Sequence, residues 1–107
     1  MNAIKIFEID LEKYPNADFF SFVDKRIKME PGEYILINIK NGGNSAIIAC
    51  PKCGCKRPLK KRIGNNGHLV TFNDKSEINV TPSLDNSDGG CCDYHGYLNN
   101  GVFTGNL

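Results

Sequence analysis

The 107-residue sequence contains no tryptophan and no apolar run long enough to cross a membrane. A membrane-spanning helix needs about 20 consecutive apolar residues, so we expect no membrane association. The first residues, from Met1 to Glu8, also lack the apolar stretch and small-residue cleavage site of a secretory signal. We therefore expect a cytoplasmic protein, in which cysteines are kept reduced and disulfides are rare.

Because tryptophan is absent, the large apolar side chains are six phenylalanines, four tyrosines and the aliphatic residues. A chain of 107 residues is long enough for one domain and too short for two separate cores, so residues 1–107 are expected to form a single domain. The core of such a domain is modest, and a bound metal would add to its stability. Five cysteines in a reduced protein are then more typical of metal ligands than of disulfides.

The pattern of apolar residues predicts a mainly β, small α+β fold. Strands are expected at residues 4–11, 34–39, 45–49, 69–72 and 77–81. Pro82 follows the fifth strand and is expected to end it. The Asn-Gly step at residues 100–101 predicts a last antiparallel hairpin. One short helix is expected at residues 17–27, because apolar residues recur there at four-residue spacing.

Two pairs of metal-ligating residues share one spacing. Cys50 and Cys53 are separated by two residues, Cys92 and His95 repeat that spacing, and a glycine follows each pair. A tight turn brings two such ligands to one side, and the glycine lets backbone N–H groups approach a thiolate. The sequence therefore predicts one Zn²⁺ per chain, held by Cys50, Cys53, Cys92 and His95. Residues 50–54 and 92–96 would each form a zinc knuckle, a tight turn that carries two ligands. The zinc between these two knuckles would close the antiparallel hairpins, in a zinc-ribbon or Rieske-like arrangement.

Neighbouring residues leave the ligand set open. Cys55 comes two residues after Cys53, and Cys91 directly precedes Cys92, so either can replace one of the four ligands. A lone histidine such as His68 is more typical of a surface position than of a metal ligand.

The same ligands leave the metal and the role of the protein open. Three cysteines and one histidine at hairpin tips also hold [2Fe–2S] clusters, which predicts an electron-transfer protein as an alternative. Six lysines and arginines and no acid lie between residues 52 and 62, a strip that would bind nucleic acid in a zinc-ribbon protein. No aromatic residue interrupts this strip, so nucleic acid is less favoured than a protein partner.

Four motifs follow one another in a specific order. They are a cysteine cluster at residues 50–55, a strand at 68–72, a Val-Thr-Pro-Ser-Leu segment at 80–84, and Cys-Asp-Tyr-His at 92–95. In this order they resemble a family of small bacterial and phage metal-binding proteins, some of them encoded in operons with ubiquitin-like conjugation components. The resemblance implies a bound metal and names no activity. In the family pattern the first two cysteines lie one residue closer, and tryptophan stands at the position of His68.

These observations predict a small non-catalytic zinc protein that acts as an interaction module for a protein partner, in a bacterial or phage conflict or conjugation system. Catalysis has little support, because binding zinc would use both Cys92 and His95. A catalytic zinc would keep an open coordination position, whereas four ligands are available here.

Overall fold

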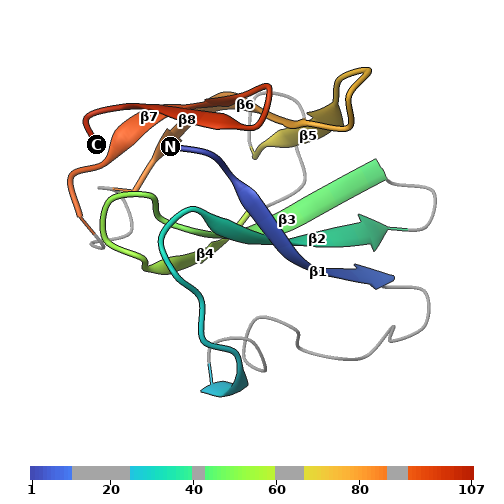
Figure 1. Ribbon diagram of the computed structural model, residues 1–107, viewed down its shortest axis with the longest axis horizontal. Coiled ribbons are helices and arrows are strands. Elements are labelled where there is room, and N and C mark those ends of the chain that lie inside the picture. Colours follow the sequence, from blue (N-terminus) through green and yellow to red (C-terminus); the bar gives the residue numbers. More distant parts are fainter. Residues whose placement is uncertain (11–24, 40–42, 60–66, 87–91) are drawn as a thin grey trace.

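The computed structural model describes residues 1–10, 25–39, 43–59, 67–86 and 92–107 (Figure 1). Within these ranges eight strands form one curled sheet, and helix is confined to Lys25 and Arg26. The strands are β1 (Ile4–Asp10), β2 (Glu33–Ile39), β3 (Gly43–Ala49), β4 (Lys56–Pro58), β5 (Leu69–Phe72), β6 (Ile78–Asp85), β7 (His95–Asn99) and β8 (Val102–Gly105). Their order across the sheet is β1, β2, β3, β5, β6, β7, β8, and β4 pairs with the C-terminal half of β3.

The curl folds the sheet into two layers, with β2 to β4 below β6 to β8 in Figure 1. The larger hydrophobic cluster lies between these layers. Tyr34 and Ile48 from the lower layer are buried together with Leu98 and Phe103 from the upper layer. Burial of apolar surface contributes roughly 25 cal/mol per Å², so the contact between the layers is a main source of stability.

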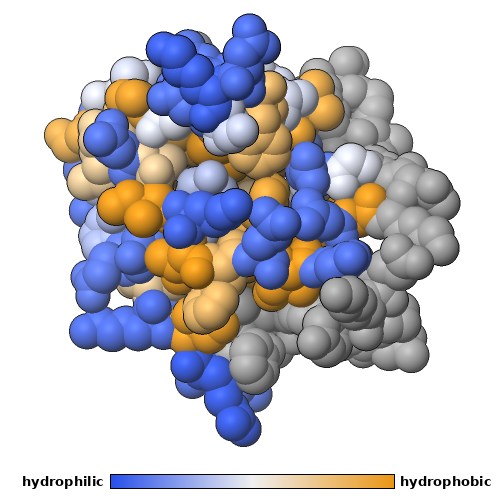
Figure 2. Space-filling model, turned by 45° about the vertical axis from the view of Figure 1, so that its right-hand side comes forward, coloured by the Kyte–Doolittle hydropathy of each residue, from blue (hydrophilic) through white to orange (hydrophobic). Residues whose placement is uncertain are grey.

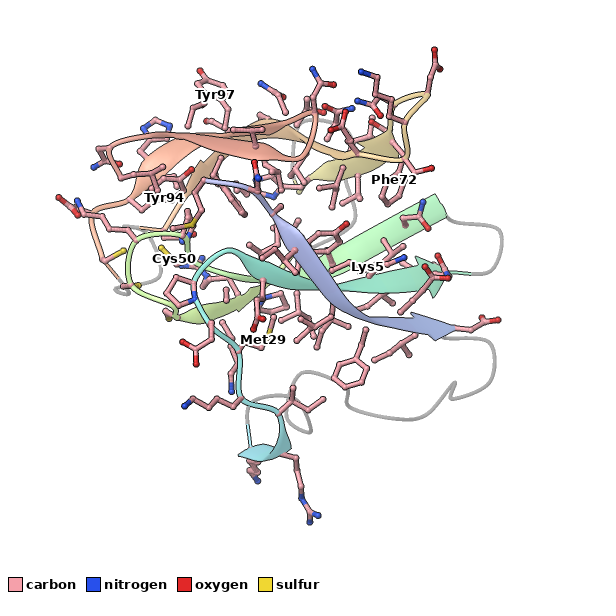
Figure 3. All side chains as sticks on the ribbon, in the orientation of Figure 1. Lys5, Met29, Cys50, Phe72, Tyr94 and Tyr97 are labelled. Atoms are coloured by element: carbon pink, nitrogen blue, oxygen red, sulfur yellow. The ribbon has the colours of Figure 1, made fainter. Side chains whose placement is uncertain are left out.

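The two faces of β2 are both covered. Tyr34 and Leu36 face the space between the layers, whereas Ile35 belongs to a second cluster with Met29 and Ile47. Figure 3 shows Met29 beneath β2 and β3, on the side away from the upper layer. Coverage on both faces explains why β2 reads as a nearly continuous apolar run.

The first three residues close the curl of the sheet. Phe103 donates its N–H to the carbonyl of Met1, and Ala3 donates to the carbonyl of Gly101, each at 2.8 Å. The strand that follows, β1, runs parallel to β2. One continuous N-terminal segment therefore pairs first with β8, at one end of the strand order, and then with β2, next to the other end.

Most of the predicted strands are confirmed. β5 has the predicted bounds, and β1, β2 and β3 differ from prediction by one or two residues. Asn100 and Gly101 have φ values of 50° and 75°, the positive values that a two-residue type I′ hairpin requires. Pro82 does not end β6, which continues to Asp85. Proline is tolerated in this strand because an irregularity in strand pairing lies there.

Three features differ from the predictions or lie beyond them. β1 and β2 pair in parallel, whereas the predicted fold was described by antiparallel hairpins. The short strand β4 lies within the basic stretch, where no strand was predicted. The predicted helix at residues 17–27 lies mostly outside the described residues, as do the segments 40–42, 60–66 and 87–91.

Some large apolar side chains reach the surface. Figure 2 shows one face of the molecule, on which hydrophobic and hydrophilic residues are interspersed. Phe7 is 51% exposed and Tyr97 is 54% exposed, and Figure 3 shows Tyr97 pointing outward from β7. In the ranges that the structure describes, no helix combines the length and the apolar character needed to cross a bilayer.

Phe103→Ala should lower the free energy of unfolding by about 3–5 kcal/mol, because it empties a site between the two layers. Tyr97→Ala is the control, since it removes an exposed aromatic ring from the neighbouring strand and should cost less than about 1 kcal/mol. Chemical denaturation followed by circular dichroism measures both losses. Equal losses would contradict this description of the core.

Candidate functional site

The first cysteine pair lies in a tight turn that follows β3. The N–H of Cys50 donates to the carbonyl of Cys55 at 2.9 Å, and the N–H of Gly54 donates to the carbonyl of Cys50 at 2.8 Å. Gly54 has a φ of 81°, a left-handed conformation that glycine adopts without strain. The turn therefore depends on the glycine that follows Cys53, as the sequence predicts.

Three thiols from the two halves of the chain gather at this turn. The sulfur atoms of Cys50, Cys53 and Cys92 all lie within 4.8 Å of one another, and those of Cys50 and Cys92 are 3.5 Å apart. Sulfur ligands of a tetrahedral zinc, each bonded at about 2.3 Å, are about 3.8 Å from one another. The spacing of the three thiols therefore fits a shared metal ion.

Electrostatics in the cluster also favour a cation. Burial raises the pKa of the Cys50 thiol, but hydrogen bonds from the N–H groups of Cys53 and Lys52, with smaller ones from the side chains of Asn86 and Cys92, bring it below its ordinary value. Desolvation and the two neighbouring thiols raise the pKa of Cys53 to about 11. Thiolates this close repel one another, so all three can ionise together only beside a positive charge.

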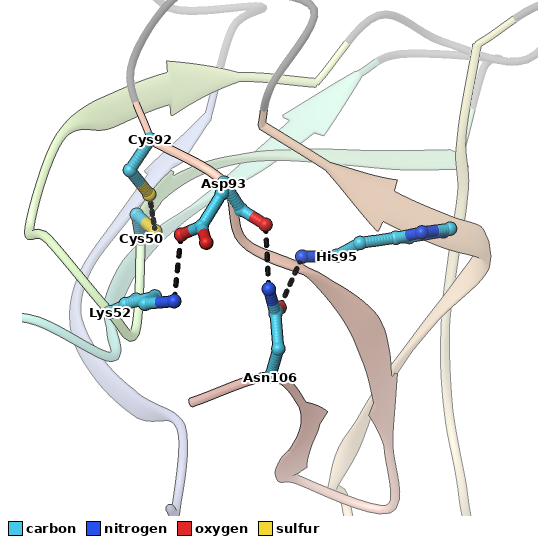
Figure 4. A network of polar contacts seen from close by, with 6 residues as sticks. All are labelled: Cys50, Lys52, Cys92, Asp93, His95 and Asn106. Atoms are coloured by element: carbon cyan, nitrogen blue, oxygen red, sulfur yellow. Dashed lines mark hydrogen bonds and ion pairs between the residues drawn. The ribbon is translucent and has the colours of Figure 1, made fainter.

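An ion pair joins the two knuckles. Lys52 Nζ lies 2.7 Å from a carboxylate oxygen of Asp93 (Figure 4). This hydrogen bond raises the pKa of Lys52 and lowers the pKa of Asp93. Both groups lie at the surface, where water screens their attraction, so the pair contributes more to the placement of the knuckles than to stability.

His95 lies close to Cys92 in the sequence but on the opposite side of the chain. The preceding residue, Tyr94, is fully buried, and its hydroxyl donates to the carbonyl of Thr104 at 2.7 Å. Successive side chains of an extended segment point to opposite sides, so His95 points outward. Figure 4 shows the imidazole directed away from the thiols. Its Nε2 lies 3.1 Å from the hydroxyl oxygen of Ser83.

An irregularity in β6 brings Ser83 to this position. The register shifts between Val80 and Leu84, so residues 81–83 have a single residue opposite them on β7. Such bulges re-aim side chains and are frequent beside functional sites. Here the bulge directs the hydroxyl of Ser83 towards the ring of His95 on the exposed face of β6 and β7.

A second histidine contacts the backbone of Ser83. The Nε2 of His68 lies 3.2 Å from the Ser83 carbonyl oxygen. With Nε2 as the donor, the ring satisfies this carbonyl inside the bulge, where strand pairing is interrupted. Beside it opens a hollow of about 240 Å³. Its lining residues are Arg57, Pro58, Leu59, Gly67, His68, Leu84, Asp85 and Asn86.

The structure brings together three of the four predicted ligands, Cys50, Cys53 and Cys92. His95 does not belong to this group, and neither does Cys55. Cys55 is disulfide-bonded, which corrects the expectation that the cysteines are reduced. Cys91 lies outside the described residues. The sequence analysis missed Ser83, because no spacing rule links a serine to a histidine twelve residues away on another strand. The only signal was its place in the Val-Thr-Pro-Ser-Leu motif that contributed to the family resemblance.

The fold and its side chains define a small β protein with two neighbouring sites. One is a thiol cluster with the spacing of metal ligands, and the other is a serine–histidine pair of the kind that activates a nucleophile. A sequence profile of the BubE family, described as bacterial ubiquitination-like system serine protease, matches residues 21–104. The chain therefore belongs to the BubE family. No curated protein and no solved structure matches the chain.

Membership of this family confirms one part of the sequence-based resemblance, the link to a bacterial ubiquitination-like system. The metal-binding part is supported by the three gathered thiols, since they lie at ligand spacing. The family description adds an activity that the sequence motifs alone did not indicate, and the serine–histidine pair gives that description a structural counterpart.

Cys50→Ser, Cys53→Ser and Cys92→Ser should each lower the affinity for a thiol-seeking divalent ion by at least about tenfold, because each removes one of three gathered sulfurs. Titration of the reduced protein with Co²⁺, followed by its thiolate absorption, measures the loss. Cys55→Ser is the control, because Cys55 is disulfide-bonded and lies outside the three gathered sulfurs, and it should keep the affinity of the unchanged protein. Loss at Cys55 together with retention at Cys50 would replace this ligand set by one centred on Cys53 and Cys55.

Proposed function

We propose that this protein is a serine peptidase that acts within a bacterial ubiquitination-like system, with Ser83 as nucleophile and His95 as general base. The observation that carries the proposal is the 3.1 Å approach of Ser83 Oγ to His95 Nε2 in a chain that belongs to the BubE family. A nucleophile and its base need hydrogen-bond contact of this length. His95 is exposed and Ser83 is half-buried, so a protein substrate can reach the pair from solvent.

The chemistry follows from the two side chains. As the hydroxyl of Ser83 attacks the scissile carbonyl, its proton passes to Nε2 of His95, and the histidine then protonates the leaving amine. The C–N bond breaks and an ester forms at Ser83. Water attacks this ester with His95 again accepting the proton, which releases the acid product and restores the hydroxyl.

A carboxylate supports this assignment of roles. The ladder pairs Asp85 directly with His95, so both side chains lie on one face of β6 and β7. A negative charge beside the ring stabilises the imidazolium that forms when the histidine takes the proton. A hollow with the volume of one large side chain is lined by Leu84, Asp85 and His68, and His68 also contacts the Ser83 carbonyl. The hollow would accommodate a residue of an extended peptide segment, and the partner is therefore proposed to be a protein substrate.

The thiol cluster serves this activity as a structural zinc site. Zinc fits because the available ligands are thiols at tetrahedral spacing, with backbone N–H groups directed at Cys50. Cys92 begins the segment that ends at His95, so a metal bound there would hold the base in place. Catalysis itself needs no metal, because the hydroxyl and the imidazole already form a nucleophile and base.

A non-catalytic zinc module is the second candidate, and the thiol cluster is the observation that favours it, since such a cluster can exist without catalysis. The nucleic-acid alternative has less support in the described part of the basic strip. Lys52 pairs with Asp93 there, and Arg57 donates to the carbonyl of Asn86 at 3.3 Å. Elemental analysis separates zinc from the iron of a [2Fe–2S] cluster.

Ser83→Ala and His95→Ala should each lower kcat/KM for peptide-bond cleavage by at least about 10³-fold, because each removes one partner of the nucleophile–base pair. The assay follows cleavage of fusions to the ubiquitin-like protein of the same system, with a serine-reactive fluorophosphonate as a second probe. The probe should label the unchanged protein and fail to label Ser83→Ala.

The matched control is Ser45→Ala, which alters a buried hydroxyl bonded to the Leu59 carbonyl in another part of the sheet. It should retain labelling. Metal content of His95→Ala separates the two roles of that residue. If the histidine is the base, one zinc per chain remains, whereas loss of zinc with unchanged cleavage would make it the ligand that the sequence predicted.

Removal of the metal should destabilise the fold. Ligand binding that forms a site only in the folded chain contributes to folding, and zinc contributes roughly 10–16 kcal/mol in small zinc peptides. We expect a strong chelator to lower the melting temperature by more than about 10 °C, and added zinc to restore it. An unchanged melting curve after verified zinc removal would refute a structural role for the metal.

A further inference from the structure

Asn106 makes a double contact with the segment that carries His95. Its side-chain oxygen accepts the N–H of His95 at 2.7 Å, and its side-chain nitrogen donates to the carbonyl of Asp93, also at 2.7 Å. The backbone N–H of Asn106 donates to the carbonyl of His95 at 3.4 Å. Figure 4 shows the carboxamide placed between Asp93 and His95. One side chain therefore fixes both ends of the segment from Asp93 to His95.

Two glycines allow Asn106 to come this close. The last pair of the β7–β8 ladder is Gly96 with Gly105. A β-carbon on Gly96 would overlap the carbonyl of Thr104, and one on Gly105 would overlap the backbone of His95. Gly105 also has a φ of 113°, which side-chain-bearing residues rarely adopt. The chain thus passes close against β7. Beyond the last ladder pair, the carboxamide of Asn106 provides the next hydrogen bonds to the segment that leads into β7.

We propose that Asn106 is a positioning residue that sets the orientation of His95 towards Ser83. The inference rests on the proposed peptidase function and deepens it. Without the carboxamide, the N–H of His95 and the carbonyl of Asp93 lose their partners and bond to water instead. The backbone that carries the imidazole can then rotate, and a shift of about 1 Å in a reacting group costs up to about a hundredfold in rate.

The same carboxamide also links the base to the thiol cluster. Asp93 follows Cys92 directly and forms the ion pair with Lys52 from the first knuckle. A continuous set of contacts therefore runs from Lys52 through Asp93 and Asn106 to His95 (Figure 4). Asn106 lies two residues beyond the region that matches the family profile, so the inference concerns this chain and not the family.

The first experiment compares Asn106→Ala with Asn99→Ala in the zinc-loaded full chain. Asn99 lies on β7 at the far end of the same hairpin and is exposed, so its change is chemically matched. Asn106→Ala should lower kcat roughly tenfold with KM changed by less than about twofold, because the loss is one of orientation and not of substrate binding. Asn99→Ala should leave both constants unchanged. Zinc content should stay the same in both variants.

The second experiment separates positioning from general stability. Asn106→Asp keeps the oxygen that accepts from the His95 N–H but loses the donor to the Asp93 carbonyl, so it preserves one of the two contacts. We expect kcat above that of Asn106→Ala. A purely structural role would lower the melting temperature of both variants and leave their kcat values alike.

Hydrogen exchange tests the inference without any catalysis. The amide of His95 should exchange at least about tenfold faster in Asn106→Ala than in the unchanged protein, because its acceptor is gone. Unchanged exchange together with unchanged kcat would overturn the inference. Failure of the proposed function is a separate result, seen when Ser83→Ala cleaves as well as the unchanged protein. In that case exchange at His95 still decides whether Asn106 holds this segment.

Discussion

The approach of Cys50 and Cys92 to 3.5 Å is the contact on which the arrangement of the two sites depends. Cys50 directly follows β3 in the lower layer, and Cys92 precedes β7 in the upper layer, so their contact fixes how the layers meet at this end of the sheet. The core between the layers contains no tryptophan and is modest in size. A metal bound by both cysteines would add strong bonds where apolar burial is limited.

The proposed nucleophile and base depend on the same contact through one short segment. The chain leaves Cys92, buries Tyr94 against Thr104 and then begins β7 with His95 on the opposite side. Burial raises the pKa of Tyr94 to about 12, with a smaller contribution from the charge of Cys50, so its hydroxyl remains a donor at neutral pH. This buried hydroxyl fixes which way the next side chain points, and the bulge in β6 brings Ser83 to meet it.

Local signals in the sequence predicted the elements whose structure depends on neighbouring residues. The alternation in β2, the Asn-Gly hairpin and the tight turn at Cys50 are all present, because each is determined within about ten residues. The sequence did not predict the pairings between segments that are distant along the chain. The parallel pairing of β1 with β2 and the closure by residues 1–3 join segments that are far apart in sequence. No local pattern specifies such partners.

Two ligand-type residues at the spacing of Cys-x-x-His can lie on the same side of the chain or on opposite sides. The conformation of the backbone between them determines which arrangement occurs. In a tight turn such as that of Cys50 and Cys53, a glycine with positive φ brings both ligands to one side. In an extended segment, successive side chains point to opposite sides of the chain. The third residue after a cysteine therefore points away from the side of the cysteine, and burial of the residue just before it holds it there. Tyr94 is that buried residue here, and Gly96 permits the close approach of β8 instead of a turn. The buried Tyr94 therefore directs the imidazole of His95 away from the thiols, although the Cys-x-x-His spacing alone predicts a ligand.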